Sequence, residues 1–550
     1  MHRFDRTFTA LFLIAGSLAA ACGSSGSGSG SGSDPTVPDP GVTPPPGSPG
    51  ADAAPPEPPK APIVTGTPDD SEINEMLGIF VAPTGAANGD GSRAHPLLTV
   101  QAGIDRARTV GKRVYVCTGT YKEALVIADS ISVIAALDCS APIWKAGAAR
   151  SRIESPTSPA VLAKTITSPT RLEGLDIVAP NVTAPGASSI GVFADHAAAI
   201  TLAKSSVKAG DAANGADGVE GTQLTLDEVA ATGGDTLLEG RCALGAGGCP
   251  ALLNINGTVK YWSNASGALG GTSICSGAPN HNGQSGGRGG STGLYAGVCP
   301  PNVPLLVRFW DPYYGASLFT PITPTVGEVR SQLAGPSGQS GAIPAALGSL
   351  TADGYVGVSG GAGTDGTPGY GGSGGRGSAA DVGYVQSGGV VNGEVWRGKG
   401  GPGGGAGGCP GLAGTPGGGG GASIALALIE SPLVVDATQL TAGKGGVGGH
   451  GTFGSDSTPG GAPGVNKSLD ANDAARGGGR GGSAGASANG SSGPSVGIMH
   501  LGAPATLVNG GRATAGAGGA DLPEQSKTDG GGTRVIPATP AGQSKDVLAL

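Results

Sequence analysis

The chain has 550 residues with a formal net charge of −8 at pH 7, and only 13% of its residues are charged and 4% aromatic. The negative charge and the lack of a basic stripe argue against nucleic acid as a partner. The 109 glycines and 43 prolines far exceed the usual combined share of about 12%. Because the 38% of hydrophobic residues come in short bursts, we expect strands separated by loops rather than a uniformly disordered chain.

Residues 1–21 have the pattern of a signal peptide. A short basic start precedes an apolar run over residues 8–18, which is too short to span a bilayer permanently. The run Leu18-Ala19-Ala20-Ala21-Cys22 resembles a bacterial lipobox, although Ala19 departs from the usual leucine. The resemblance implies that Cys22 is lipidated and that the protein is exported and membrane-anchored, in the outer membrane or at the cell surface of a Gram-negative bacterium. An ordinary secretory signal cut after Ala21 is the alternative.

Residues 22–75 are expected to form a disordered tether. Residues 23–33 are glycine and serine only, and residues 34–62 are rich in proline, so the first part is flexible and the second stiffer and more extended. No hydrophobic period survives in this stretch that could direct packing. The tether would hold a folded body away from the membrane.

Residues 76–235 are expected to begin the folded body, with short strands around one helix. Within this stretch, a family resemblance is carried by Pro96, Thr99, Val100, Gln101, Ile104, Val114, Tyr115, Val116, Gly119, Tyr121 and Glu123. In this order, over residues 78–135, they resemble the N-terminal capping segment of the pectin-lyase-like family. The resemblance implies an all-β fold, a right-handed parallel β-helix, in which each coil of about 20–25 residues stacks on the next.

Cysteines support the coil spacing. Cys117 and Cys139 are 22 residues apart, which would place them on adjacent coils about 4.8 Å apart and within disulfide range. Cys242 and Cys249 form a second candidate pair in a local loop. No cysteine or histidine spacing indicates a zinc site.

A repeat marks later coils. Ser189-Ile190-Gly191-Val192, Ser423-Ile424-Ala425-Leu426 and Ser495-Val496-Gly497-Ile498 are each followed, 19 or 20 residues after the serine, by Ala-Gly and then glycine-rich chain. We expect one coil repeated, with a glycine-rich insertion leaving at the same corner; coincidence in a low-complexity chain is the alternative. Residues 236–345 are expected to be an irregular insertion with cysteines and aromatic residues, and residues 346–545 a glycine-rich repeat region with further coils.

The glycine tracts resemble those of PGRS-type surface proteins, in composition only. Such tracts can pack as adjacent polyproline-II-like strands or stay mobile, and both possibilities remain open at this point. If they are loops outside the core, deleting residues 444–475 should lower the melting temperature only slightly.

Catalysis is the function to test first, since the resembled fold hosts polysaccharide lyases and hydrolases. His450 lies in a Gly-His-Gly triplet, but no Asp or Glu occurs in residues 398–421 upstream, so a catalytic role is not expected. We predict no catalytic residue, no metal site and no cofactor. The aromatic cluster Phe309, Trp310, Tyr313 and Tyr314 would contact a ligand or a partner, or anchor the irregular insertion.

These observations predict a non-enzymatic, membrane-anchored surface lipoprotein with a structural or adhesive role. Its partners would be the membrane, through the lipid, and extracellular polysaccharide or other surface proteins. The alternatives are a divergent polysaccharide lyase or glycoside hydrolase and a carbohydrate-binding module without turnover.

Overall fold

The structure is a computed structural model that describes residues 62–550 with several gaps. The stretches outside the description are 1–61, 236–241, 244–252, 256–257, 261–266, 292–294, 299–318, 322–324, 346, 378–380, 388–389, 397–399 and 466–473. Within the described part, no helix has the length and apolar character required to cross a membrane.

The body begins with an extended stretch, a 3₁₀ turn η1 (Asp70–Glu72), strand β1 (Gly78–Ala86) and helix α1 (Val100–Val110). Thr99 caps α1 by accepting a hydrogen bond from the Ala102 amide, and Gly111 ends the helix in the left-handed conformation at φ 64°. The Glu123 carboxylate accepts hydrogen bonds from the Val100 and Gln101 amides at 2.7 and 2.9 Å. The helix therefore starts where these side chains satisfy its first amides.

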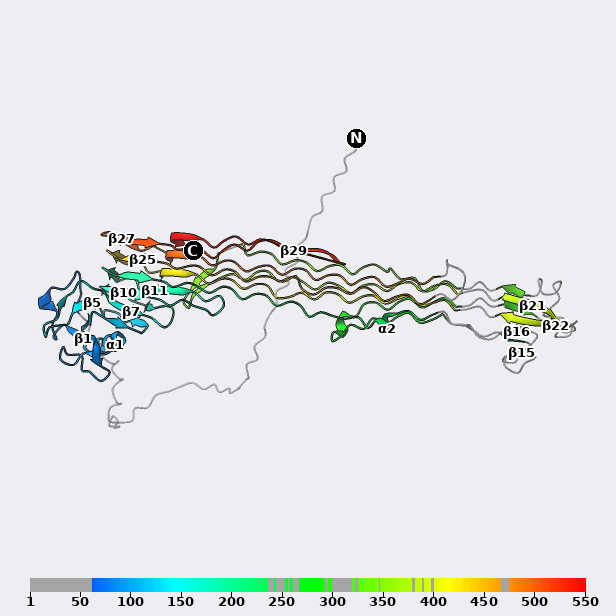
Figure 1. The fold of residues 1–550 in the computed structure, drawn as a ribbon, viewed down its shortest axis with the longest axis horizontal. Helices are drawn as coiled ribbons and strands as arrows, with labels where there is room; N and C mark the ends of the chain where they lie inside the picture. The colour runs from blue at the N-terminus through cyan, green and yellow to red at the C-terminus, as the bar shows by residue number, and fades with distance from the viewer. Residues whose placement is uncertain are drawn as a thin grey trace, which may run out of the picture. The chain divides into compact units, whose positions relative to one another are not determined.

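Nineteen of the described strands, joined by one short antiparallel strand, form three parallel sheets that the chain visits in rotation (Figure 1). The first sheet contains β1, β2 (Arg113–Cys117), β5 (Val133–Asp138), β9 (Thr170–Glu173), β12 (Ile200–Ala203), β24 (Val434–Asp436) and β27 (Thr506–Val508), with β6 (Lys145–Ala146) beside β5. The second contains β3 (Thr120–Tyr121), β7 (Ser151–Glu154), β10 (Leu175–Val178), β13 (Ser206–Lys208), β25 (Gln439–Thr441) and β28 (Arg512–Thr514). The third contains β4 (Leu125–Ile127), β8 (Val161–Lys164), β11 (Ser189–Asp195), β23 (Ser423–Ile429), β26 (Ser495–Leu501) and β31 (Ser544–Ala549).

One strand from each sheet makes a coil, and successive coils pair in parallel. The strands alternate side chains between an inner and an outer face, and the inner ones form one apolar core that includes Ile153, Leu172, Val192, Leu202 and Leu426. The sheets are not closed into a barrel. The arrangement confirms the all-β class and is compatible with the expected parallel solenoid.

The sequence repeat coincides with strand pairing. Ser189 pairs with Ser423, and Ser423 with Ser495, in the parallel ladder β11–β23–β26. The buried hydroxyl of Ser423 accepts from the Gly443 amide at 2.8 Å and donates to the Gly210 carbonyl of the previous coil at 2.7 Å. Ser189 and Ser495 accept in the same way from Gly210 and Gly516. These bonds explain why each serine is followed at a fixed distance by a glycine.

The predicted Cys117–Cys139 disulfide is present, with a Cα–Cα distance of 5.8 Å. A second disulfide joins Cys275 to Cys409, also at a Cα–Cα distance of 5.8 Å, and was not expected. The pairing of Cys242 with Cys249 stays a prediction, because Cys249 and the Cys242 side chain lie outside the described part of the chain.

Between the second and third sheets the chain leaves the coils at Gly210, Gly443 and Gly516, at one corner each time. It then runs as extended segments that hydrogen-bond to one another and form an extended bundle (Figure 1). The segments are residues 210–235, 267–275, 283–291, 325–345, 357–377, 400–421, 443–465, 476–493, 516–524 and 537–543. Segments 267–275, 283–291 and 325–345 of the expected irregular insertion therefore belong to this bundle.

Several short helices and hairpins lie outside the three parallel sheets and the extended segments. They are α2 (Glu228–Ala231), η2 (Pro279–His281) and the hairpins β19–β20 (Ser349–Thr351, Gly354–Val356) and β29–β30 (Gln525–Asp529, Gly532–Ile536). Leu350 and Tyr355 of the first hairpin pack on the apolar outer face of the third sheet. At the end of the bundle opposite the coils lie two antiparallel sheets, one of β14 (Cys242–Ala243), β22 (Val390–Trp396) and β21 (Asp381–Ser387), the other of β15 (Leu253–Ile255), β16 (Thr258–Lys260), β17 (Tyr295–Val298) and β18 (Phe319–Pro321).

Candidate functional site

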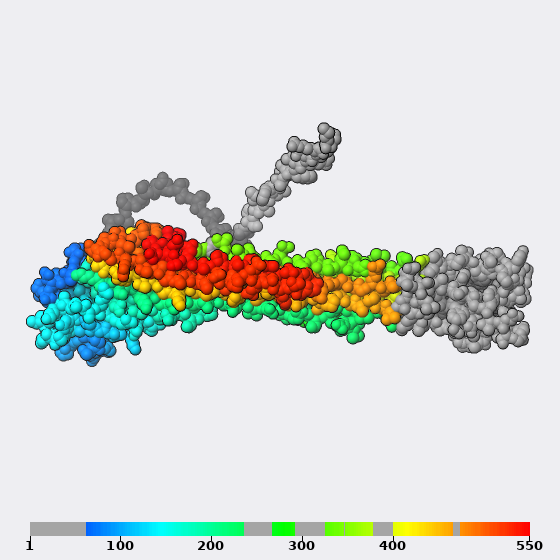
Figure 2. All heavy atoms as spheres, turned by 45° about the horizontal axis from the view of Figure 1, so that its top comes forward, coloured from blue at the N-terminus to red at the C-terminus, as the bar shows by residue number. Residues whose placement is uncertain are grey.

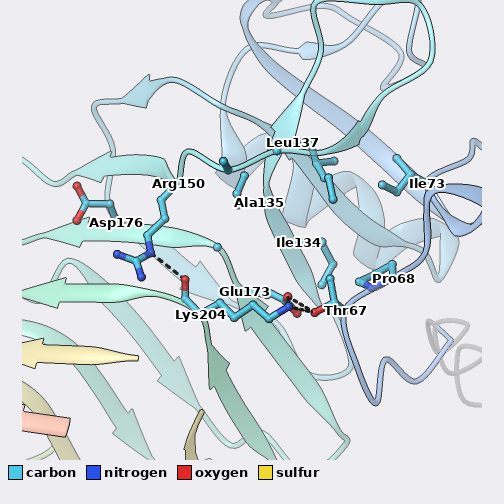
Figure 3. Close-up of a pocket in the computed structure, with 15 residues that line it drawn as sticks. Thr67, Pro68, Ile73, Ile134, Ala135, Leu137, Arg150, Glu173, Asp176 and Lys204 are labelled. Carbon is cyan, nitrogen blue, oxygen red and sulfur yellow. Dashed lines mark hydrogen bonds and ion pairs between the residues drawn. The ribbon is translucent and has the colours of Figure 1, made fainter. Parts of the chain in front are cut away.

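A pocket of about 760 Å³ lies against the first sheet, in the size range of small-molecule sites (Figure 3). Its floor is apolar and includes Ile134, Ala135 and Leu137 of β5. Thr67, Pro68 and Ile73, from the stretch before β1, form one wall. Arg150, Glu173 at the end of β9, Asp176 of β10 and Lys204 form the polar side, and Thr67 lies beside Glu173 and Lys204 where this side meets the wall.

Glu173 is the most enclosed charged group of the pocket, with a side chain only 4% exposed. It binds Arg171 Nε at 2.6 Å, Lys204 Nζ at 3.3 Å and the Thr67 hydroxyl at 2.5 Å. Burial alone would raise the pKa of Glu173, but the hydrogen bonds from Thr67 and Arg171 and the charges of Arg171 and Lys204 outweigh it and hold the pKa below its ordinary value. Glu173 is therefore ionised at neutral pH, and its carboxylate binds three donors, from Arg171, Lys204 and Thr67.

The other carboxylate of the pocket is also paired. Asp176 accepts a hydrogen bond from Arg152 at 3.0 Å, and Arg150 donates through Nε to the Lys204 carbonyl at 2.8 Å (Figure 3). Acid–base hydrolysis of a glycoside needs two carboxyl groups with divergent pKa values facing the scissile bond. The charged groups here instead bind one another, so the pocket is built as a contact between chain segments.

A second pocket of about 850 Å³ lies beside the Cys117–Cys139 disulfide and Trp144. Its cation, Arg93, stacks over the Phe80 ring at 5.5 Å. Its carboxylate, Asp138, accepts from the Ser140 amide, and this hydrogen bond lowers the pKa of Asp138. Within the described residues, no group of three or more His, Cys, Asp or Glu side chains could hold a metal ion.

The extended bundle is organised around its central segment, residues 400–421. Six other segments hydrogen-bond to it: 210–235, 267–275, 283–291, 357–377, 443–465 and 476–493. The bonds to each neighbour recur every three residues, for example Gly405, Gly408 and Gly411 to the carbonyls of Arg476, Gly479 and Gly482. A repeat of three residues with hydrogen bonds only between segments is the geometry of packed polyproline-II-like chains. Of the two possibilities open from composition, the structure therefore has the packed one.

Glycine is required at the closest approaches between segments. A Cβ atom on Gly403, Gly404 or Gly405 would lie closer than 3.0 Å to the carbonyl oxygens of Leu269, Gly372 or Gly461, which belong to three different neighbours. Figure 2 shows the result from outside, where segments far apart in the sequence lie in close contact along the bundle. The central segment is buried over most of its length. The bundle replaces an apolar core by backbone hydrogen bonds at close approach.

The lipidation residue Cys22 and the aromatic residues Phe309, Trp310, Tyr313 and Tyr314 lie outside the described part of the chain. His450 is described; its amide donates to Asp217 and its ring Nδ1 contacts Gln525 at 3.1 Å. Sequence reasoning missed the three-residue glycine period of the central segment, visible at Gly405, Gly408, Gly411, Gly414, Gly417 and Gly420. It also missed the Glu173 cluster, whose members are scattered in sequence and carry no motif.

The chain was compared with protein-family models, with curated proteins and with solved structures, and none of the three comparisons gives a match.

Proposed function

We propose that the protein is an exported, non-enzymatic surface lipoprotein in which a right-handed parallel β-helix carries a stiff glycine-rich shaft with a structural or adhesive role. The right-handed sense is supported by the near-universal handedness of parallel crossover connections. The lipid anchor is supported by the lipobox-like run that ends at Cys22.

The observation that carries the proposal is the six-neighbour packing of the central segment. At about 3.1 Å per residue, 22 residues in this conformation extend roughly 65 Å. Because each segment is bonded to its neighbours every three residues, bending one requires breaking rows of bonds in several. The bundle is thus suited to hold something at a fixed distance rather than to bind a substrate along its length.

The ends of the segments indicate which part of the chain the bundle holds at a distance from the coils. Residues 235, 267, 291, 325, 377, 400, 465 and 476 all lie at the end of the bundle opposite the coils, where the bonds Gly290–Gly375, Gly377–Thr325 and Gly403–Gly234 bring them together. The four connections that start and finish there contain three of the chain's four tryptophans, Trp262, Trp310 and Trp396. Aromatic side chains of this kind supply binding energy at sugar and protein interfaces. We therefore propose extracellular polysaccharide or another surface protein as the partner.

The proposal is tested on cells that display the full-length chain. Residues 299–318, which contain the Phe309-Trp310 cluster, are replaced by a Gly/Ser linker of equal length, and residues 466–473 are replaced in the same way as the matched control. We expect binding of the cells to immobilised polysaccharides or partner cells to fall at least tenfold in the first variant only, with surface display unchanged. Equal binding by both variants contradicts the adhesive role. Release of unsaturated or reducing sugar ends by the purified protein, above a boiled sample, contradicts the non-enzymatic assignment.

A further inference from the structure

The stretch before β1 takes an unexpected path. Residues 62–73, here called the strap, run along the outer face of the first sheet in the direction opposite to its strand order. Thr67 lies beside Glu173 at the end of β9 and beside Lys204 after β12, whereas Glu72 lies beside Arg113 and Tyr115 of β2. The chain therefore meets the fold at the fourth coil and travels back to the first before β1 begins.

The far end of the strap is held by a polar cluster in which Arg171 and Glu173 are buried, whereas Thr67 and Lys204 are exposed. The Thr67 hydroxyl donates to Glu173 Oε1 and accepts from Lys204 Nζ. Arg171, 6% exposed, holds the second oxygen of Glu173 and lies 3.7 Å from Asp436 on β24. Hydrogen bonds to charged groups are worth about twice as much as neutral ones, more so where water is excluded. One threonine is thereby linked to three consecutive coils.

The near end of the strap is held by apolar packing. Ile73 is 2% exposed and packs with Phe80, Tyr115, Ile134, Leu137 and Trp144, and Val64 packs against the same cluster. The Asp70 carboxylate accepts the Ala146 amide at 3.2 Å, and the Tyr115 hydroxyl donates to the Glu72 carbonyl. The strap is thus fixed at both ends and along its middle.

The consequence concerns β1, which among the described strands is the edge strand of the first sheet and pairs there with β2 alone. A pull on a chain that entered directly at β1 would peel this strand away one hydrogen bond after another. A pull on residue 62 instead reaches the packing of Val64 and the Thr67–Glu173–Lys204 cluster first, and these contacts must break before β1 is loaded.

We propose that the strap is a mechanical lock, which passes load from the tether into the fourth coil and shields the N-terminal edge of the fold. The direction of load rests on the proposed function, since it assumes an anchor at Cys22; the lock itself does not.

The test compares Thr67→Val/Lys204→Met in the full chain with Thr65→Val/Lys208→Met as control, since Thr65 and Lys208 are exposed residues of the strap and of β13. Hydrogen exchange is followed by mass spectrometry. We expect exchange over residues 70–86 to rise about tenfold or more in the first variant, with β23 and β26 unchanged. In pulling experiments between the chain termini, the first rupture should then occur at a lower force than in the wild type and the control.

Exchange over residues 70–86 within twofold of the wild type would overturn the lock. An equal rise in β23 and β26 would also overturn it, because the cluster would then act on the whole fold rather than on the edge. Neither readout depends on lipidation, so loss of the Cys22 anchor would fail the proposed function and leave this result standing.

Discussion

Gly477 and Gly478 are neighbours in segment 476–493, but an added Cβ atom would meet different surroundings at the two positions. At Gly478 it would lie closer than 3.0 Å to the Ala406 carbonyl of the central segment, whereas at Gly477 the nearest atom, the Gly461 oxygen, is 3.3 Å away. Backbone atoms cannot rotate aside as a side chain can. The pair therefore separates the packing requirement from the general cost of losing a glycine.

We predict that Gly478→Ala lowers the free energy of unfolding by about 2 kcal/mol, as overpacking of a close contact does. Gly477→Ala should change it by less than about 0.5 kcal/mol. Denaturant unfolding followed by circular dichroism measures both. Equal effects would show that the segments are not in close contact at this point.

Glu173 makes stability depend on pH. Because its pKa is lower in the folded protein than in the unfolded chain, its contribution is present above the ordinary glutamate pKa of about 4.5 and is lost as the pH falls through the folded pKa. Glu173→Gln should cost about 3 kcal/mol at pH 7, since it leaves Arg171 without its closest partner. The difference between variant and wild type should shrink below pH 4.5 in thermal unfolding scans. A difference that is constant from pH 7 to pH 3 would contradict the role of the charge.

At the scale of elements, helix α1 and the strands around it could be predicted because the residues that fix the start of the helix lie in neighbouring elements. Thr99 and Glu123 bind the first amides of α1, and the Gln101 side chain accepts from the Val126 amide at 2.8 Å. The serine repeat was equally visible, since each copy occupies one register position. By contrast, the path of the strap could not be predicted, because the bonds of Thr67 join it to Glu173 and Lys204, 106 and 137 positions away, in a proline-rich context.

The bundle was only half predictable. Its composition allowed both packed and mobile chains, and the deciding signal, a glycine at every third position, is diluted by the many other glycines around it. Where it persists, as in collagen, only glycine fits at the point of closest approach. Glycines that recur at every third position along one segment favour the packed form.

The deletion of residues 444–475, harmless if the tracts were loops, is now expected to be severe. Segment 443–465 donates to the central segment through Gly446, Gly449, Ser455, Thr458 and Gly461 and accepts from segment 476–493. Removing it exposes rows of unpaired amides and carbonyls in both neighbours, and each buried unpaired group costs about 1–3 kcal/mol. We predict loss of cooperative unfolding by calorimetry for this deletion. A melting temperature within a few degrees of the wild type would restore the loop interpretation.

At the scale of the whole molecule, the proposed membrane anchor depends on one residue, Cys22. Cys22→Ala should move the protein from the membrane fraction to the soluble exported fraction, because an acyl chain supplies about 0.8 kcal/mol per buried methylene. Fractionation with immunoblotting checks the location, and mass spectrometry of the mature N-terminus checks the lipid. An unmodified N-terminus in the wild type would contradict the anchor.

The small helix α2 has a consequence for how such a shaft can change in length. Val219 and Ala231 are twelve residues apart, yet their partners in the central segment, Thr415 and Ala406, are only nine apart. The three additional residues of segment 210–235 lie around α2, which Asp227 caps. Beyond α2, the hydrogen bonds to the central segment continue every three residues in the same register. Three residues are one full turn, about 9 Å of rise. The length of the bundle can therefore change only in steps of one turn. An insertion of three residues in every segment would lengthen the bundle by one step, whereas an insertion in a single segment can be accommodated in a short helix beside the bundle, as in α2.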